Sequence, residues 1–445
     1  MFHTAKEVEE FIYSSYVKRY KEIPHGDDSQ VRNPHLTRRM LDELGGPDRS
    51  QKNIMITGSK GKGSLSVMVA KILEGHGKKV GLFTSPHLRD YRERLRVNGK
   101  AISEDALLSL GETLRPIYER IEGELPPHRY IGPVGATAVM AMCWFRDERT
   151  DINVVECGRG ARYDDVNQIR GFIGGINKIF LEHTGPLGWT IDEVAHHKAG
   201  LIKPSMSAVF TAEQSKYADL VLRYEARKFG RHLYHFNEDF TAFDIRLTRQ
   251  GTLFSVQGRK GVYTDLRLSL LGRHQGENAA LAIAICEEAL GRTLDNQVLK
   301  AVLAGIRWPG RMEILSEHPL TILDGCISKE SMAQVQDIVG FLDWKRVITI
   351  LAIPEDKDYL GVLEMVAEYD GPVIMTHADN DYLKFTHQQV KEGQKIHPVE
   401  FRESVAEAVL RARELAKEDD LILCLGTQSF IKDMKIFYGE DTLNI

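Results

Sequence analysis

Apolar and polar positions along the chain follow two different periods, and the change between them marks its segments. The first fifty residues carry apolar side chains at helical spacing, as in EVEEFIYSSYVKRY, and a glycine pair follows PHLTRRMLDEL. Continuous apolar runs then appear, first NIMIT at residues 53–57 and next KVGLFTS at residues 79–85. Such runs are typical of strands that are buried on both faces of a parallel sheet.

The order of these runs predicts the fold class. A strand, a glycine-rich loop, a helix and a second strand follow one another over residues 53–85, which indicates a βαβ unit. Further apolar runs, expected to be strands, occur at residues 152–156 (INVVE), 176–183 (INKIFLEH) and 207–213 (SAVFTAE). Residues 243–271 alternate instead, and predict antiparallel strands at one edge of the same domain.

A proline and glycine break, RWPGR at residues 307–311, precedes a second series of alternating strands and helices. We therefore predict an α/β protein of two domains. Residues 1–308 form a helical N-terminal segment with a P-loop domain built on a parallel sheet, and residues 309–445 form a smaller Rossmann-like domain.

Composition narrows the class of partner. A net charge of −5 over 445 residues argues against a surface for nucleic acid or anionic membranes and favours small-molecule partners. No apolar run reaches the length that spans a bilayer. The five cysteines are far apart and show no metal-ligand or disulfide spacing, so we expect a reduced, cytoplasmic chain.

The loop GSKGKGS, residues 58–64, carries the first candidate chemistry. Gly58, Gly61 and Gly63 allow the backbone amides to turn inward, Lys62 adds a positive charge, and Ser64 offers a hydroxyl to Mg²⁺. After a buried strand, this pattern predicts a bound nucleoside triphosphate. The loop alone leaves open whether the protein is a kinase, a GTPase or a ligase.

Two further side chains are candidates for a cation site. Glu156 ends the run INVVE, and His183 ends the run INKIFLEH. Both are expected at carboxyl ends of parallel strands, where ligands of open α/β sheets bind.

Six ordered segments resemble the Mur ligase superfamily, in its folylpolyglutamate synthase and dihydrofolate synthase branch. The segments are ITGSKGKGS, FTSPHLRDYRERLRVNGKAIS, VVECGRGARYDDVN, EHTGPLGWTIDEVAHHKAGLIKP, GRHQGENAALAIA, and WPGRMEIL with the LDG that follows. The resemblance implies an ATP-dependent, ADP-forming ligase that activates a carboxylate as an acyl phosphate and joins it to an amino acid. It also implies a monomer.

The resemblance assigns roles to individual residues. It implies that residues 58–64 (including Ser59 and Lys60), Asn278, Arg311 and Asp324 bind ATP, and that Ser64, Ser85 and Glu156 bind Mg²⁺. His183 and a carbamylated Lys198 would hold a second Mg²⁺. The implied catalytic residues are Lys62, Glu156, His183 and Lys198. The implied acceptor site comprises Arg162, Asp164 and Asn167. A carbamate forms only on a neutral amine, so we expect burial to lower the pKa of Lys198.

The chain departs from the family at several positions, and far more in the amine-binding half than in the ATP-binding half. The family's D-G-A-H-N-P is here D-G-C-I-S-K, so Ile327 replaces a histidine that is associated with the incoming glutamate. G-S-L-Y becomes GTQSF, Lys60 replaces an asparagine, and His197 replaces a glutamate. A Mur-type ligase for a non-folate acid or a non-glutamate amine is therefore an alternative. A P-loop kinase or nucleotide-binding module, and a non-catalytic relative, are further alternatives.

Overall fold

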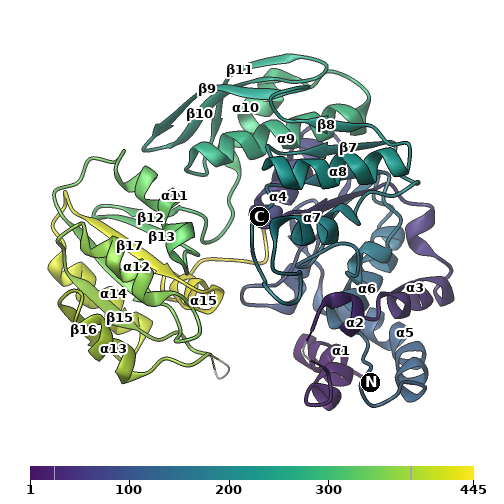
Figure 1. Ribbon diagram of the computed structural model, residues 1–445, viewed down its shortest axis with the longest axis horizontal. Helices are drawn as coiled ribbons and strands as arrows, with labels where there is room; N and C mark the ends of the chain where they lie inside the picture. Colours follow the sequence, from purple (N-terminus) through teal and green to yellow (C-terminus); the bar gives the residue numbers. More distant parts are fainter. Residues whose placement is uncertain (25, 381–382) are drawn as a thin grey trace.

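Two large β-sheets divide the chain into two bodies (Figure 1). The computed structural model describes residues 1–24, 26–380 and 383–445. The strands of the first sheet are β1 (Asn53–Thr57), β2 (Val80–Phe83), β3 (Leu95–Val97), β4 (Lys100–Ala101), β5 (Ile152–Glu156), β6 (Ile173–Ile176), β7 (Ala208–Thr211) and β8 (Leu233–His235). They lie in the order β4-β3-β2-β5-β1-β6-β7-β8, and those from β2 to β8 run parallel. The predicted α/β class is confirmed.

Helices cover both faces of this sheet, because successive strand residues point to opposite sides. Met55 and Val155 pack in one core and Ile54 and Val154 in the other. The first core is completed by α1 (Ala5–Arg19), α3 (Pro34–Glu43), α5 (Glu104–Gly123), α6 (Pro133–Asp147), α7 (Ile191–Ala199) and α8 (Lys216–Lys228). The second is completed by α4 (Lys62–Gly75), α9 (Arg273–Leu290) and α10 (Asn296–Gly305). The short helix α2 (Asp28–Val31) precedes α3.

The predicted antiparallel strands form a sheet of their own. They are β9 (Thr241–Thr248), β10 (Gly251–Gln257) and β11 (Val262–Leu268), in the order β11-β10-β9. Phe254, Val256 and Leu266 of this sheet pack in the same core as α9 and α10. The sheet therefore belongs to the first body and extends its core beyond the helices.

The second body is built on a six-stranded sheet. Its strands are β12 (Glu313–Glu317), β13 (Leu320–Asp324), β14 (Val347–Ala352), β15 (Val373–Thr376), β16 (Val399–Arg402) and β17 (Leu421–Gly426), in the order β12-β13-β17-β14-β15-β16. All pairs are parallel except β12 with β13. Its helices are α11 (Lys329–Val339), α12 (Tyr359–Ala367), α13 (His387–Gly393), α14 (Val405–Leu415) and α15 (Gln428–Phe437). The boundary predicted between residues 308 and 309 falls between α10 and β12.

One predicted strand is wrong in its extent. A strand was expected over residues 176–183, but β6 ends at Ile176 and His183 lies in the loop that follows, at φ 47°. The neighbouring strands β1 and β7 end at Thr57 and Thr211, which are the partners of Ile176. Beyond Ile176 the chain has no strand to pair with.

Residues 440–445, which we call the C-terminal strap, return from the second body to the first (Figure 1). The amide of Ala101 donates to the carbonyl of Leu443 at 3.2 Å, and the amide of Ile445 donates to Gly99 at 3.0 Å. Beneath the strap, buried Arg96 donates from Nη2 to the Thr442 carbonyl at 2.8 Å and from Nε to the Leu443 carbonyl at 3.2 Å. The two bodies are thus joined at two places along the chain.

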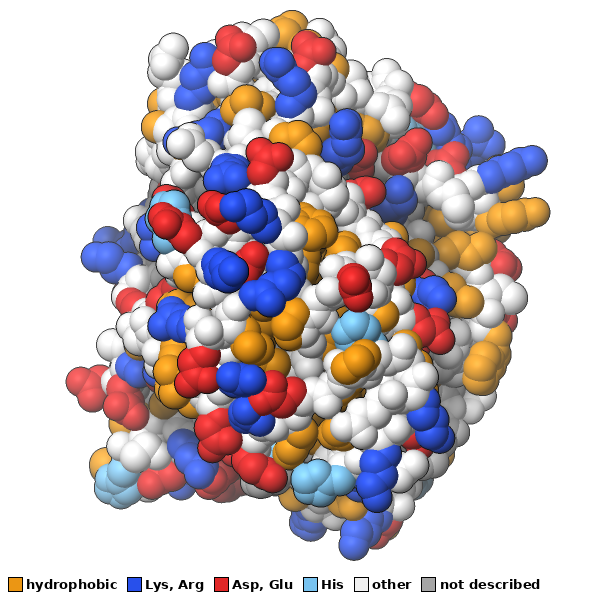
Figure 2. All heavy atoms as spheres, turned by 90° about the vertical axis from the view of Figure 1, so that its left-hand side faces the viewer, with side chains coloured by type: hydrophobic (Ala, Val, Ile, Leu, Met, Phe, Trp, Pro, Cys, Tyr) orange, Lys and Arg blue, Asp and Glu red, His pale blue; other side chains and the backbone are white. Residues whose placement is uncertain are grey.

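The surface agrees with the charge balance of the sequence. On the face of the second body in Figure 2, acidic and basic side chains are intermingled, with small apolar areas between them. Among the helices of the described residues, none combines the length and apolar character needed to cross a bilayer.

Candidate active site

The glycine loop joins β1 to α4 and lies against the residue that follows β6. Gly61 has φ 74°, in the left-handed region that glycine adopts without strain. A Cβ there would lie 2.6 Å from Nδ2 of Asn177, so a side chain would displace that amide. Because α4 begins at Lys62, its unpaired N-terminal amides lie beside the loop and provide an anion site.

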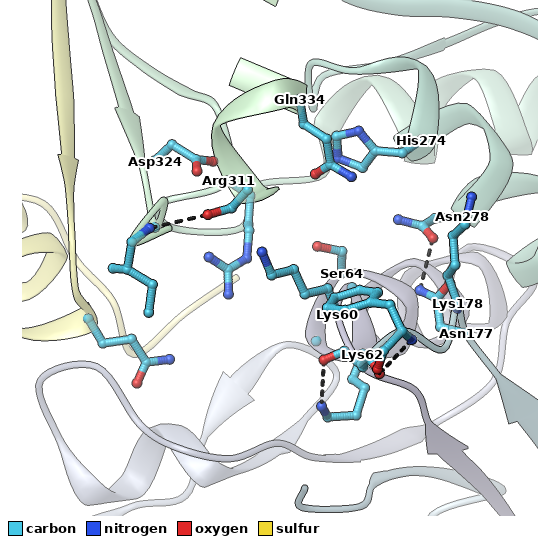
Figure 3. Close-up of a pocket in the computed structure, with 18 of the residues that line it drawn as sticks. Lys60, Lys62, Ser64, Asn177, Lys178, His274, Asn278, Arg311, Asp324 and Gln334 are labelled. Atoms are coloured by element: carbon cyan, nitrogen blue, oxygen red, sulfur yellow. Dashed lines mark hydrogen bonds between the residues drawn. The ribbon is translucent and has the colours of Figure 1, made fainter. Parts of the chain in front are cut away.

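A cavity of about 890 Å³ lies between this loop and the second body (Figure 3). Lys60 of the loop and Arg311 of the second body extend toward each other across it. Two cations that converge on open space suit a polyanion such as a triphosphate. The predicted residues that line the cavity are Ser59, Lys60, Gly61, Lys62, Gly63, Ser64, Ser85, Glu156, His183, Asn278, Arg311 and Asp324. The predicted residues that do not line it are Gly58, Arg162, Asp164, Asn167 and Lys198.

Lys62 is folded back over its own loop. Its Nζ donates to the carbonyls of Gly58 at 3.0 Å and Ser59 at 3.4 Å. These are weak neutral acceptors compared with a phosphate oxygen. The ammonium is therefore free to exchange them for a phosphate that enters the loop.

Glu156 and Ser64 present oxygen atoms to the same cavity. The Glu156 carboxylate accepts a hydrogen bond from the Ser85 amide at 3.4 Å, and burial raises its pKa to about 7. The Ser64 hydroxyl is buried without a hydrogen-bond partner. A carboxylate and a hydroxyl are ligands that Mg²⁺ prefers, and both groups have unused bonding capacity.

His183 reaches the cavity from the loop after β6. Its Nε2 lies 3.9 Å from the carboxylate of Glu182, and burial lowers its pKa, which favours the neutral ring. Within residues 1–24, 26–380 and 383–445, no three His, Cys, Asp or Glu side chains come together as a metal site. A divalent ion would thus depend on serine hydroxyls, water and phosphate oxygens as well.

Lys198 lies beneath the loop and is fully buried. Its Nζ donates to the carbonyls of Gly58 and Arg159, both at 2.9 Å, and lies 2.8 Å from Oε1 of Glu182. Burial lowers its pKa to about 8, against the opposing charge of Glu182. The expected lowering is therefore present, although three acceptors surround the amine.

Several neutral polar side chains line the far end of the cavity. Asn278 accepts from Nδ2 of Asn177 at 2.9 Å and donates to Gln275 at 3.1 Å. Burial lowers the pKa of His274 to about 4, so its ring is neutral at pH 7. Figure 3 places this ring beside Gln334 of α11. Neutral amides and an imidazole suit a heterocyclic base better than a phosphate.

The comparisons with known proteins agree with this geometry. The family model of the Mur ligase middle domain matches residues 136–286. The dihydrofolate synthase/folylpolyglutamate synthase of Mycobacterium tuberculosis is 30% identical over 362 residues, which cover 77% of this chain and 74% of that protein. This chain belongs to the folylpolyglutamate synthase and dihydrofolate synthase family. The enzyme of that name from Bacillus subtilis is 26% identical over 408 residues, covering 89% and 93% of the two chains.

Solved structures of the family extend the match to the whole chain. A folylpolyglutamate synthase of M. tuberculosis in complex with ADP has a TM-score of 0.86 at 25% identity and covers 98% of both chains. The Thermotoga maritima enzyme has a TM-score of 0.84 at 26% identity, covering 98% of this chain and 96% of its own. The predicted family and enzyme class are confirmed: the chain is an ATP-dependent, ADP-forming ligase.

The three residues predicted for the acceptor site of this synthase-family chain lie outside the cavity. Arg162 donates from Nε to the His196 carbonyl at 3.1 Å, and Asn167 donates to the Gly200 carbonyl at 2.9 Å. Asp164 accepts from the amide of Val166 at 2.9 Å. Arg162 and Asn167 thus fasten the segment after β5 to the end of α7, and Asp164 holds a turn within that segment.

Several lining residues of the family site were missed by the sequence analysis. Asn177, Lys178 and Phe180 lie directly after β6. Glu156 was identified because it ends a predicted parallel strand. The same reasoning would have found Asn177 if the end of β6 had been predicted at Ile176. Missed residues of the other elements include Arg159, Glu213, His274, Glu277, Glu330, Gln334 and Leu383.

Proposed function

We propose that this ligase joins a folate-class carboxylic acid to an amino acid, with an acyl phosphate as the intermediate. The relatives described above are synthases of dihydrofolate and folylpolyglutamate. The observation that carries the proposal is the single cavity shared by the phosphate-binding loop, buried Glu156 and Arg311 of the second body.

The first step transfers the γ-phosphoryl group of ATP to the acceptor. A carboxylate oxygen of the acid attacks the phosphorus, and the bond to the bridging oxygen of ADP breaks. Both reactants are anions, so their approach requires neutralisation. Lys60, Lys62 and Arg311, with the amides at the start of α4, supply positive charge around the transferring group.

The second step consumes the acyl phosphate. The neutral amine of the amino acid attacks the carbonyl carbon, inorganic phosphate leaves, and an amide forms. Water competes for the same carbon, so the second body must cover the cavity during the reaction. Arg311 and Asp324 contribute to this cover, because both belong to the second body and line the cavity.

Mg²⁺ would be held by Ser64, Ser85 and Glu156, with His183 and a modified Lys198 for a second ion. The unpartnered Ser64 hydroxyl and the under-coordinated Glu156 carboxylate fit this role. When bound, the ion supplies positive charge to the β- and γ-phosphate oxygens.

We also propose that Lys198 is carbamylated in the active enzyme. Its neutral amine adds to the carbon of CO₂ and loses one proton. The lowered pKa supports this, because roughly one tenth of such amines are neutral at pH 7. Its contact with Glu182 opposes it, so formation of the carbamate requires this ion pair to open.

The proposal predicts strict coupling of phosphate release to both substrates. The assay combines purified protein, ATP and Mg²⁺ with dihydropteroate or tetrahydrofolate and with a panel of amino acids. We expect phosphate only when an acid and an amine are both present. Lys62→Ala should lower the rate about 10²-fold or more, since it removes charge from the transferring group. The exposed lysine variant Lys216→Ala is the matched control.

The alternatives give different results in the same assay. Release without any amine would indicate a kinase or an ATPase, and full turnover of Lys198→Ala would favour that class. Failure to bind ATP with Mg²⁺ would indicate a non-catalytic relative.

The setting of the enzyme is also part of the proposal. We propose a monomer in the reducing cytoplasm. All five cysteines are free and buried, as expected of a chain that does not depend on disulfides.

A further inference from the structure

A wall of the cavity in the second body lies beyond the residues that the nucleotide requires. We call it the strand-end wall; it comprises Gly325, Ile327, Leu383 and residues 427–429. These residues follow β13, β15 and β17, which are parallel members of one sheet. Carboxyl ends of parallel strands are where open α/β sheets bind their ligands. This wall is the natural site for the amine substrate.

The strand-end wall carries no charged side chain among its six members. Thr427 buries a hydroxyl that has no hydrogen-bond partner, and Gln428 offers an amide. Ile327 is half-buried, and its backbone amide donates to the Ser331 hydroxyl at 3.3 Å. These groups can bond neutral polar atoms and cover aliphatic carbon, but they cannot neutralise a carboxylate.

Nearby parts of the second body do not supply the missing charge. Among its described residues, the cavity is lined by one cation, Arg311, and by two carboxylates, Asp324 and Glu330. Arg311 extends toward Lys60 and the phosphate-binding loop (Figure 3). Glu330, which is exposed at the start of α11, would repel an acidic side chain.

Of the first-body cations that line the cavity, Lys60 and Lys62 are already assigned to the phosphates of the nucleotide. Arg159 donates from Nε to the Asp28 carboxylate at 3.0 Å. Lys60 lies over the Phe180 ring at 5.6 Å, and Lys62 is bonded to the loop. Lys178 lies beside Asn278 at the base end (Figure 3), where burial raises the pKa of Glu277 against the charge of this lysine. An amino acid with two carboxylates would leave one of them unpaired in the cavity, which costs several kcal/mol.

We infer that the amine substrate is an amino acid with an uncharged side chain, which lies against Ile327 and Gln428. Such an amino acid brings at most one carboxylate into the cavity. Relatives of this chain are named folylpolyglutamate synthases, after a product that contains glutamate. The inference rests on the proposed function and specifies its amine.

Direct binding tests the inference separately from turnover. Isothermal titration calorimetry of the full chain, loaded with Mg²⁺ and AMPPCP, compares glutamine, leucine and glutamate. We expect glutamine or leucine to bind at least tenfold more tightly than glutamate. Tighter or equal binding of glutamate, or no binding of any of the three, overturns the inference. The phosphate assay decides the proposed function independently, because it includes glutamate among its amines.

Two variants place a cation on the strand-end wall. Ile327→His and Gln428→Arg should each shift the glutamate-to-glutamine ratio of affinities toward glutamate by about tenfold. Ile436→His makes the same change on the exposed part of α15 and should keep the wild-type ratio. Circular dichroism checks that each variant is folded. If neither folded variant shifts the ratio, the wall does not contact the side chain and the inference fails.

Discussion

At the scale of single residues, burial sets the charge state of the side chains around the cavity. It raises the pKa of Glu156 to about 7 and lowers those of Lys198 to about 8 and His274 to about 4. In each case burial disfavours the charged form and is the largest cause. Glu156 in the cavity and Lys198 beneath the loop therefore change protonation near neutral pH, whereas His274 stays neutral.

Glu156 gives the first residue-scale prediction, which concerns Mg²⁺. Without the ion, half of the Glu156 carboxyls are protonated near pH 7, and the ion binds only the carboxylate. Protonation dominates below the pKa, so the affinity for Mg²⁺ should be about tenfold weaker at pH 6 than at pH 8. Calorimetry with Mg²⁺ and AMPPCP measures this difference. Glu156→Gln should bind weakly with little pH dependence, and a flat profile of the wild type would contradict the assignment.

Lys198 gives the second residue-scale prediction, which concerns its carbamylation. Because its neutral fraction rises with pH through about 8, a carbamate signal from ¹³C-bicarbonate should grow between pH 6.5 and 8.5 in NMR spectra. The signal should be absent from Lys198→Ala. Lys203 is the matched control, since it is also buried with a pKa lowered to about 8. A signal that depends on Lys203 instead would refute the proposal.

At the scale of elements, most of the buried parallel strands were predictable, whereas the edge strands of the second sheet were not. β1 and β5 are buried at every position, so their sequences NIMIT and INVVE are nearly continuous apolar runs. β12 and β16 lie at the two edges of the second sheet and are only partly buried. Partial burial leaves a mixed sequence with no clear period, and the sequence analysis found neither strand.

The end of β6 shows a second limit. Apolar Ile179 and Leu181 continue the pattern past Ile176, and Ile179 is indeed buried, but in a loop. Strand length was decided by the partners β1 and β7, which are distant in sequence. This misplacement also hid Asn177, which packs so closely against Gly58 and Gly61 that a Cβ on either glycine would clash with it.

The candidate site was predictable where its residues belong to one continuous motif. Residues 53–64 combine a buried strand with the glycines, lysine and serine of the loop within a short span. The pairing of Arg159 with Asp28, and of Lys198 with Glu182, joins separate segments and follows no local pattern. The family resemblance identified Lys198, but its hydrogen-bond and ion-pair partners are apparent only in the structure.

At the scale of the whole molecule, the C-terminal strap predicts a dependence of stability on Arg96. Arg96→Ala would remove the donors to the carbonyls of buried Thr442 and half-buried Leu443, at a cost of about 2–3 kcal/mol. We expect a melting temperature several degrees lower, measured by calorimetry. Exposed Arg292→Ala is the control and should melt like the wild type. An unchanged melting temperature of Arg96→Ala would show that the strap contributes little.

The same samples test the proposed monomer. In sedimentation, wild type and control should each behave as one chain of 50.3 kDa. A stable dimer of the wild type would contradict that proposal.

The two chain crossings, one at residues 306–312 and one at the C-terminal strap, also constrain how the cavity can open. A body held by a single linker can swing in any direction, whereas a body held at two separated points turns mainly about the line that joins them. Opening for nucleotide entry and closing over the acyl phosphate would then retrace one hinge rotation, which returns Arg311 to the same position in every catalytic cycle.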